Sequence, residues 1–241
     1  MYTNAGFNLR QSRGIPYYSC AAFESLPCRP WLRHGFSTRH GVAPDLEDAA
    51  LVTLHQVHSD KVHVAESDFI TRNDIEGDAL VTRTPRMALA IKTADCFPLL
   101  IADPVHKAVG AVHSGWRGTL ADILTRTLET MNRCFGSDPA RLMVALGPGI
   151  GACCFEVGEE VARLFMQAYP ETAPAQAIAE RPGKFLVNLV AVLQAQLARA
   201  GVPPENQHNL GICTCCNTRE FFSYRAEGAS AGRMMSVIAI V

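Results

Sequence analysis

The sequence has almost no net charge and no long apolar run, and each absence excludes a class of protein. Its 241 residues carry 22 Lys and Arg against 23 Asp and Glu, a formal net charge of −1. Without a basic excess, we expect no binding to nucleic acid. Because no apolar stretch reaches the ~18 residues of a membrane span and residues 1–19 do not resemble a secretory signal, we expect a cytoplasmic protein without membrane contact.

Cysteine is present, but its pattern is not typical of disulfides. The count of nine is odd, and no export signal accompanies it. In a reducing compartment these residues are thiols, some of which can bind a metal. Adjacent cysteines occur at 153–154 and in the motif CTCC at 213–216. No second cluster is evident as a partner for CTCC, so we interpret that motif as structural.

The pattern of short apolar runs predicts an α/β fold. With 48% hydrophobic residues the chain can bury a large core, and we treat residues 1–241 as a single domain. Strands are predicted at 35–39, 51–55, 61–65, 79–82, 87–93, 97–103, 108–114, 141–146, 210–213, 221–225 and 233–241. Helices are predicted at 118–134, 157–169 and 188–201, and a surface loop at 170–182. Since strands and helices do not alternate, a mixed sheet flanked by helices is favoured over a Rossmann fold.

Three possible metal ligands stand at the ends of predicted strands. They are His58, Cys96 and His113. Two imidazoles and one thiolate suit Zn²⁺, and three protein ligands leave a fourth position open, as in catalytic zinc sites. The long spacings suit ligands delivered by separate strands of a formed fold. Taken singly, each residue is better explained as a partly buried strand residue with a satisfied hydrogen bond.

Several neighbouring residues suggest a substrate pocket. Asp95 lies in an otherwise apolar run, where an unpaired carboxylate would be costly, so it is a candidate to orient a ligand or substrate. Arg117 opens a predicted helix, where its charge opposes the helix dipole and makes a bound anion attractive. The turn at 147–151 is a candidate pocket lining, and residues 221–225 would deliver aromatic side chains and Arg225.

The motifs together resemble one family. HGFSTRHG, LHQVHSDKV, GDALVT, KTADCFPLLIADP, AVHSGWRG, LGPGIGACCFEVG, CTCCNTREFFSYR and GRMMSVI follow one another across residues 34–238. They resemble the laccase-domain family, also called multicopper polyphenol oxidase-like or purine nucleoside phosphorylase-like, which includes peptidoglycan editing factors.

This resemblance implies a fold, a metal and a set of activities. The implied fold is a sandwich of mixed β-sheets flanked by helices, with a cysteine-hydrolase-like architecture. The implied zinc ligands, with a catalytic role, are His58, Cys96 and His113. Members phosphorolyse adenosine, inosine, guanosine and methylthioadenosine or deaminate adenosine, so a nucleoside and phosphate are the expected partners. We expect a monomer or a weak homo-oligomer.

One segment departs from the family. A stretch that contributes an anion-binding Arg in relatives is missing between Gly41 and Leu54. Arg39, Arg117 and Arg225 are then the remaining candidates for binding phosphate.

Other functions stay open at this stage. Cys96 could act as a nucleophile with His113 as base, in an amidohydrolase that edits peptidoglycan precursors. A copper polyphenol oxidase is disfavoured because the chain has no His-x-His pair. A non-catalytic zinc module would need a fourth protein ligand.

Overall fold

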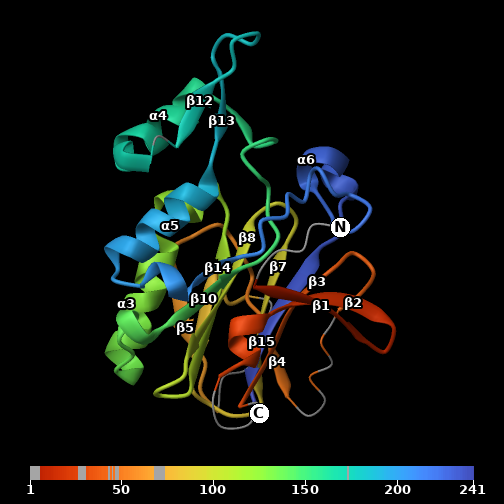
Figure 1. Cartoon of the computed structure of the whole chain (residues 1–241), viewed down its shortest axis with the longest axis vertical. Coiled ribbons are helices and arrows are strands. Elements are labelled where there is room, and N and C mark those ends of the chain that lie inside the picture. Colours follow the sequence, from red (N-terminus) through yellow and green to blue (C-terminus); the bar gives the residue numbers. More distant parts are fainter. Residues whose placement is uncertain are drawn as a thin grey trace.

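The computed structural model describes residues 6–26, 31–42, 44, 46, 49–67, 74–172 and 174–241. Within these ranges the chain forms stacked layers of mixed sheets flanked by helices, which confirms the predicted fold class (Figure 1). The shortened stretch between Gly41 and Leu54 lies partly outside the described residues.

The strands form three sheets in the described part of the chain. The first contains, in spatial order, β1 (Phe7–Ser12), β2 (Ile15–Cys20), β3 (Leu32–Ser37), β15 (Met234–Ile240), β7 (Met87–Thr93) and β4 (Ala50–Val52). The second contains β14 (Gln207–Asn209), β10 (Met143–Leu146), β8 (Phe97–Asp103), β9 (Ala108–Ser114), β6 (Ala79–Thr82) and β5 (Val62–Val64). The small third sheet contains β11 (Glu156–Gly158), β13 (Lys184–Val187) and β12 (Ala175–Ala177).

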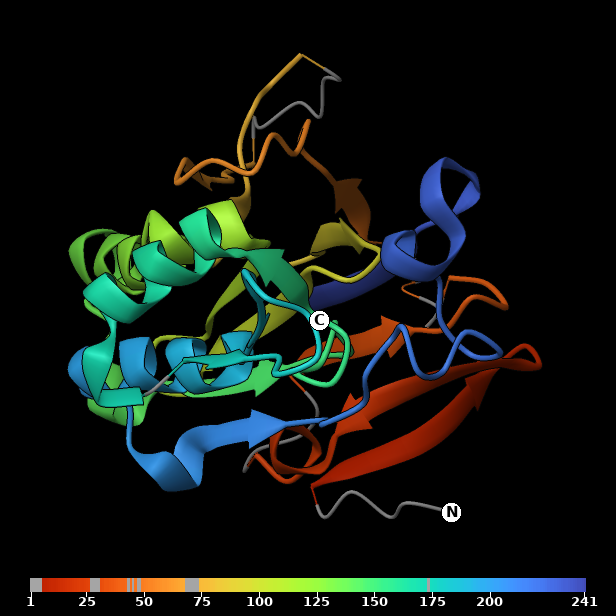
Figure 2. The same ribbon diagram turned by 90° about the horizontal axis from the view of Figure 1, so that it is seen from above.

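The helices are concentrated in the second half of the chain. They are α1 (Ala21–Glu24), α2 (Trp116–Leu120), α3 (Ile123–Phe135), α4 (Glu159–Ala168), α5 (Leu189–Arg199) and α6 (Tyr224–Glu227). Short 3₁₀ turns lie at η1 (Pro139–Arg141), η2 (Pro170–Thr172), η3 (Pro204–Asn206) and η4 (Gly228–Ser230). Figure 2 shows the helices α3, α4 and α5 gathered on the opposite side of the molecule from the strands β1 and β2.

Strand β8 lies in a middle layer and is buried on both faces. Leu99 and Ile101 join the core cluster that includes residues of α3 and α5. Leu100 and Ala102 join the cluster shared with the first sheet. Burial on both sides explains why the strand sequence FPLLIA before Asp103 is continuously apolar instead of alternating. The ends of β8 are therefore anchored in a buried layer of the molecule.

The N-terminal hairpin is a feature that the sequence analysis missed. Strands β1 and β2 pair in antiparallel register around a two-residue turn at Arg13 and Gly14. Both turn residues have positive φ, +49° and +80°. Such a turn matches the twist of the flanking strands, and an X-Gly dipeptide is its usual signal. The signal was present, but the polar strand β1 lacks the apolar pattern that predicts a strand.

The helix predicted at 118–134 is two helices, because Asp122 interrupts it in the left-handed region at φ +59°. An aspartate tolerates this conformation better than most residues do. Its carboxylate accepts hydrogen bonds from the Tyr169 hydroxyl at 2.5 Å and the Gln196 amide at 2.8 Å. These contacts tie the break to α5 and to the end of α4.

Three predictions near the C-terminal half were wrong. Residues 210–213 are not a strand, because Gly211 turns the chain at φ +69° after the short strand β14. Residues 221–225 are not a strand either: the Ser223 hydroxyl accepts the Ala226 N–H at 3.3 Å and caps the helix α6. The loop predicted at 170–182 contains η2 and β12, although residue 173 lies outside the described residues.

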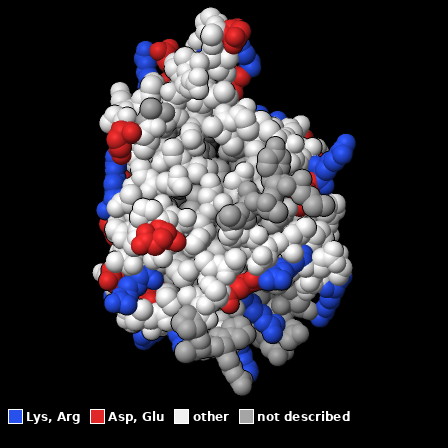
Figure 3. Space-filling view, viewed as in Figure 1, with Lys and Arg blue, Asp and Glu red and all other residues white. Residues whose placement is uncertain are grey.

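Charged side chains are mixed on the surface. On the face drawn in Figure 3, the basic and acidic side chains of the described residues are interspersed, without a broad patch of one sign. No helix within the described residues is both long enough and apolar enough to span a membrane.

The buried imidazole of His34 predicts a pH dependence of stability. Burial lowers its pKa from 6.5 to about 4, and its Nε2 accepts the Cys20 N–H at 2.8 Å. A lowered histidine pKa means that the unfolded chain takes up the proton first. The contribution of the neutral His34 ring to the free energy of unfolding is therefore complete above pH 6.5. It is lost as the pH falls toward 4, and the total loss is about 3 kcal/mol.

The test compares the wild type with His34→Gln, which keeps an acceptor but does not titrate. We expect urea unfolding to show a smaller drop in stability between pH 7 and pH 4.5 for the variant. Equal drops in the two proteins would contradict the prediction.

Candidate metal centre and pocket

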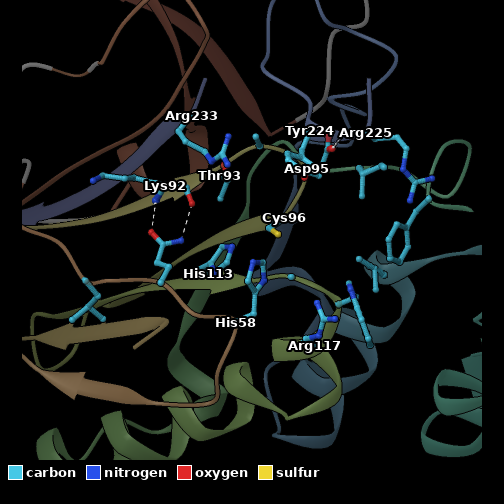
Figure 4. A pocket seen from close by; sticks show the side chains of 18 residues that line it. His58, Lys92, Thr93, Asp95, Cys96, His113, Arg117, Tyr224, Arg225 and Arg233 are labelled. Atoms are coloured by element: carbon cyan, nitrogen blue, oxygen red, sulfur yellow. Dashed lines mark hydrogen bonds between the residues drawn. The ribbon is translucent and has the colours of Figure 1, made fainter. Parts of the chain in front are cut away.

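The three predicted ligands meet at one point. Their ligand atoms all lie within 4.8 Å of one another, and the His58 and His113 ring centroids are 4.8 Å apart. His58 comes from the loop after β4, Cys96 directly precedes β8, and His113 lies near the end of β9. In Figure 4 the three side chains point toward one another at the centre of a pocket. The structure thus brings together residues up to 55 positions apart in the chain.

Strand register explains how two of these residues become neighbours. Strands β8 and β9 are antiparallel, with Phe97 opposite Ser114 and Pro98 opposite His113. Cys96 is therefore placed just beyond the last pair of the ladder, on the same edge of the sheet as His113.

A buried carboxylate, Asp78, organises the two histidines. It is 0% exposed, and its Oδ1 accepts a hydrogen bond from His113 Nδ1 at 2.7 Å. The same carboxylate accepts the backbone N–H groups of Val57, His58 and Ser59 and the Ser59 hydroxyl. It therefore fixes both the His113 ring and the loop that carries His58, whose own φ is +60°. A carboxylate behind a ligating histidine is a usual support of metal sites.

A glycine makes room for the ligands. A Cβ placed on Gly115 would lie 2.6 Å from His58 Nδ1 and 2.8 Å from Cys96 Sγ. Any side chain at this position would displace these two donors, so the donors are packed closely against the backbone that follows β9. The donor set, its spacing and the Asp78 support all fit a single metal ion with an open coordination position.

The electrostatics of the centre favour a deprotonated sulfur. Burial raises the pKa of the Cys96 thiol, but hydrogen bonds with His113 and His58 outweigh burial and lower it to about 7. Burial lowers the pKa of His113, but Asp78 and Cys96 outweigh it and raise that pKa to about 9. For Asp78, burial is outweighed by His113 and Ser59, which lower its pKa to about 2. The thiolate is the form of cysteine that binds metals.

The centre lies in a cavity of about 610 Å³. Apolar and aromatic side chains supply part of the wall, among them Trp116, Phe155 and Tyr224. Four cationic side chains also line it: Lys92, Arg117, Arg225 and Arg233. A cavity of this volume is within the usual range for small-molecule sites.

The predicted anion-binding residues are distributed unevenly. Arg117 lines the cavity and its guanidinium lies 4.3 Å from the Trp116 ring centroid. Arg225 also lines it, but its guanidinium donates to the carbonyls of Cys154 and Glu156, each at 2.9 Å. Arg39 is not part of the lining in the described residues: it pairs with Glu227 at 3.0 Å. The structure therefore favours Arg117 over Arg39 as a contact for an anion.

Asp95 lines the cavity, but its carboxylate is already engaged. One oxygen accepts a hydrogen bond from the Thr214 hydroxyl at 2.7 Å, and the other accepts one from the backbone N–H of Arg225 at 2.6 Å. The Asp95 carbonyl also accepts the Ile150 N–H at 2.7 Å. Asp95 thus joins three separate segments of the pocket wall, and its φ of +90° shows that the backbone is constrained there.

The sequence analysis missed Lys92 and Arg233. Lys92 lies on β7 and Arg233 directly precedes β15, and the pairing of Met234 with Thr93 places them on adjacent strands. The only available signal was their position inside the motifs KTADC and GRMMSVI. Asp78 stands in the motif GDALVT, but nothing local distinguishes a turn aspartate from a buried one.

The fold and this centre define a class: an α/β sandwich with a His–Cys–His metal-binding group at the edge of its middle sheet. A sequence model described as "Multi-copper polyphenol oxidoreductase laccase" matches residues 35–241, and the chain belongs to this family. The resemblance stated from the motifs is therefore confirmed.

Relatives and solved structures agree with this assignment. A protein of Deinococcus radiodurans named purine nucleoside phosphorylase is 41% identical over 188 residues, which cover 78% of this chain and 69% of the relative. A prokaryotic protein named adenosine deaminase RL5 is 36% identical, covering 80% and 76% of the two chains. The crystal structure of the Bacillus licheniformis hypothetical protein YfiH matches with a TM-score of 0.84 at 26% identity, over 98% of this chain and 100% of that one.

Replacing Asp78 by Asn is predicted to weaken metal binding. The amide removes the charge behind His113 Nδ1, and losses of about 10–100-fold in affinity are typical of such changes. We expect chelator competition, followed through the imidazole NMR signals of His113, to show a loss of this size.

Asp103→Asn is the matched control. Asp103 is equally buried and bonds His106 Nδ1 at 2.9 Å, but at the opposite end of β8. Both variants should lower the midpoint of thermal unfolding, and only Asp78→Asn should lower metal affinity. Equal metal affinities in the two variants would refute the role given to Asp78.

Proposed function

We propose that this protein is a zinc-dependent enzyme that processes purine nucleosides. The reaction is phosphorolysis of adenosine, inosine, guanosine or methylthioadenosine, or deamination of adenosine. One observation carries the proposal: the group of His58, Cys96 and His113 lies within a cavity that cationic side chains surround. The names of the relatives, purine nucleoside phosphorylase and adenosine deaminase, support the choice of substrate.

The cavity suits a nucleoside in both size and chemistry. Its aromatic wall residues Trp116, Phe155 and Tyr224 offer flat surfaces on which a purine base can pack. The Arg117 guanidinium lies against this wall, 4.3 Å from the Trp116 ring centroid, and supplies charge for phosphate. Among the described residues, no hydrogen bond is seen at this guanidinium, so its N–H groups are free to donate.

For phosphorolysis, the chain has to place two reactants and stabilise a charge. A phosphate oxygen forms a bond to C1′ as the bond from C1′ to the purine nitrogen breaks, and the purine leaves with that electron pair and takes up a proton. The sugar becomes cation-like on the way, so positioning and charge placement contribute most. Arg117 would hold the phosphate, and the aromatic wall would hold the base.

The metal-binding group fits zinc better than several coppers. Two imidazoles and one thiolate are common zinc ligands, and a zinc ion held there would supply a Lewis acid at the substrate. Multicopper chemistry needs many histidines, whereas the metal-binding groups of the described residues contain only His58 and His113. Asp78 keeps Nδ1 of His113 occupied, so the other ring nitrogen would be the one available to hold the ion.

The direct test is incubation of the purified, zinc-loaded protein with adenosine, with and without phosphate. Inosine in both samples identifies deamination, and adenine formed only with phosphate identifies phosphorolysis. We expect His58→Ala to abolish either product, because one of three metal ligands is lost. His106→Ala is the control, since His106 lies outside the cavity and at the other end of β8.

Two results would overturn the proposal. One is no product above the His58→Ala background. The other is an activity that survives chelation and is blocked by a thiol alkylator, which would favour the alternative amidohydrolase with Cys96 as nucleophile.

The free guanidinium of Arg117 predicts a variant that loses phosphate binding. Arg117→Ala should raise the KM for phosphate about tenfold, since a charge-assisted hydrogen bond is worth about 1.5–3 kcal/mol. The KM for the nucleoside should change less. Arg163→Ala is the control, because Arg163 is an exposed cation on α4 that pairs with Glu159. A phosphate KM unchanged in Arg117→Ala would contradict the assignment.

A further inference from the structure

A second cluster of metal-binding side chains lies outside the centre described above. Cys153 and Cys154 follow the turn after β10, and Cys213 and Cys216 follow β14. Their four sulfur atoms all lie within 4.8 Å of one another. The sequence analysis assigned CTCC no partner, and this was wrong: the partner is the cysteine pair about 60 positions earlier.

The distances between the sulfurs suit a metal ion rather than disulfides. Cys216 Sγ lies 3.5 Å from Cys153 Sγ and 3.4 Å from Cys154 Sγ, and all four residues are free thiols. A disulfide requires about 2.05 Å. Four sulfurs placed tetrahedrally at about 2.3 Å from a zinc ion are about 3.8 Å apart. The cluster therefore has the dimensions of a four-thiolate zinc site.

The backbone around the cluster already holds the two loops in place. The Gly151 N–H donates to Cys213 Sγ at 3.2 Å, and the Thr214 N–H donates to the Gly149 carbonyl at 3.0 Å. A Cβ on Gly151 would lie 3.2 Å from Cys153 Sγ and 3.1 Å from Cys213 Cβ, so glycine leaves the space that the sulfurs occupy. An N–H donated to a sulfur is typical of the surroundings of cysteine ligands.

Cys215 provides an internal contrast. It belongs to the same CTCC motif and packs against the apolar core, as Cys154 and Cys213 also do, yet it is not one of the four grouped residues. The motif thus contributes Cys213 and Cys216 to the cluster, and Cys215 stays outside it. Cysteine content alone does not decide which residues join the cluster.

We propose that Cys153, Cys154, Cys213 and Cys216 bind one Zn²⁺ in a tetrahedral, four-sulfur site. Four protein ligands leave no position for substrate, so this ion is structural, in contrast to the three-ligand centre. Cys153 and Cys216 are exposed, which gives the ion a path from solvent.

The site would fix one wall of the cavity. Ile150 and Phe155 line the cavity and lie on either side of the cysteine pair. The Arg225 guanidinium donates to the Cys154 carbonyl, and the Thr214 hydroxyl donates to Asp95, the neighbour of Cys96. The proposed ion therefore joins the two loops that carry Phe155 and the partner of Asp95.

Metal content of the whole chain tests the site without any nucleoside, so the outcome is independent of the proposed enzyme activity. The protein is stripped under reducing conditions, loaded with Zn²⁺, and freed of excess metal. We expect two zinc ions per chain in the wild type and in Cys215→Ser, and one in Cys153→Ser/Cys216→Ser. If the wild type binds a single zinc ion and only the Cys96→Ser substitution removes it, the proposal is overturned.

Cobalt identifies the ligands in the Cys96→Ser variant, which has no thiolate left in the other centre. We expect strong thiolate-to-cobalt charge-transfer absorption from Co²⁺ in this variant, and its loss when Cys153→Ser and Cys216→Ser are added. No such absorption in Cys96→Ser would refute the four-sulfur site.

Counting the free thiols of the protein distinguishes a metal site from disulfides at these cysteines. Under denaturing, chelating conditions without reductant, a metal site returns all nine thiols of the chain. Two or four missing thiols in freshly purified protein, together with no bound zinc, would overturn the proposal in favour of disulfides.

Discussion

The buried carboxylate of Asp78 is the interaction on which the rest of the centre depends. A buried and unpaired charge would cost several kcal/mol, so this residue is tolerated only where donors converge on it. Three consecutive backbone N–H groups of the loop at 57–59 and the His113 ring supply them. Because the same contacts satisfy the carboxylate and orient both histidines, the stability of this region and the geometry of the centre have one cause.

The middle sheet provides the rigid support. Strands β8 and β9 are buried along their whole length, and their register places Cys96, the residue directly before β8, beside His113. The loop that carries His58 is the more constrained part, since His58 itself has positive φ and Gly115 leaves no space behind it. Ligands held by packed strands stay within the narrow limits that a metal ion requires.

The sequence predicted the buried strands and singled out the three residues that meet at the centre, because both leave local signals, namely apolar runs and residue types with metal-binding chemistry. It did not predict the β1–β2 hairpin, whose first strand is polar, nor the break at Asp122, where contacts with Tyr169 and Gln196 override helical periodicity. The positions of Lys92 and Arg233 at the pocket, and the contact of Asp78 with His113, depend on strand pairing. That pairing cannot be read from the sequence. Long-range partners such as Cys153 and Cys216 are found only once the chain is folded.

The two cysteine-containing groups differ in a way that assigns them different tasks. The centre of His58, Cys96 and His113 offers three donors beside a cavity, whereas the four-cysteine cluster offers four sulfur donors, which is the number that a closed structural zinc site needs. Asp95 connects them, because it precedes Cys96 in the chain and binds the hydroxyl of Thr214, which follows Cys213. A shift of the cysteine loop would therefore be passed to the backbone of Cys96, so a structural ion at one group would hold a ligand of the other in place.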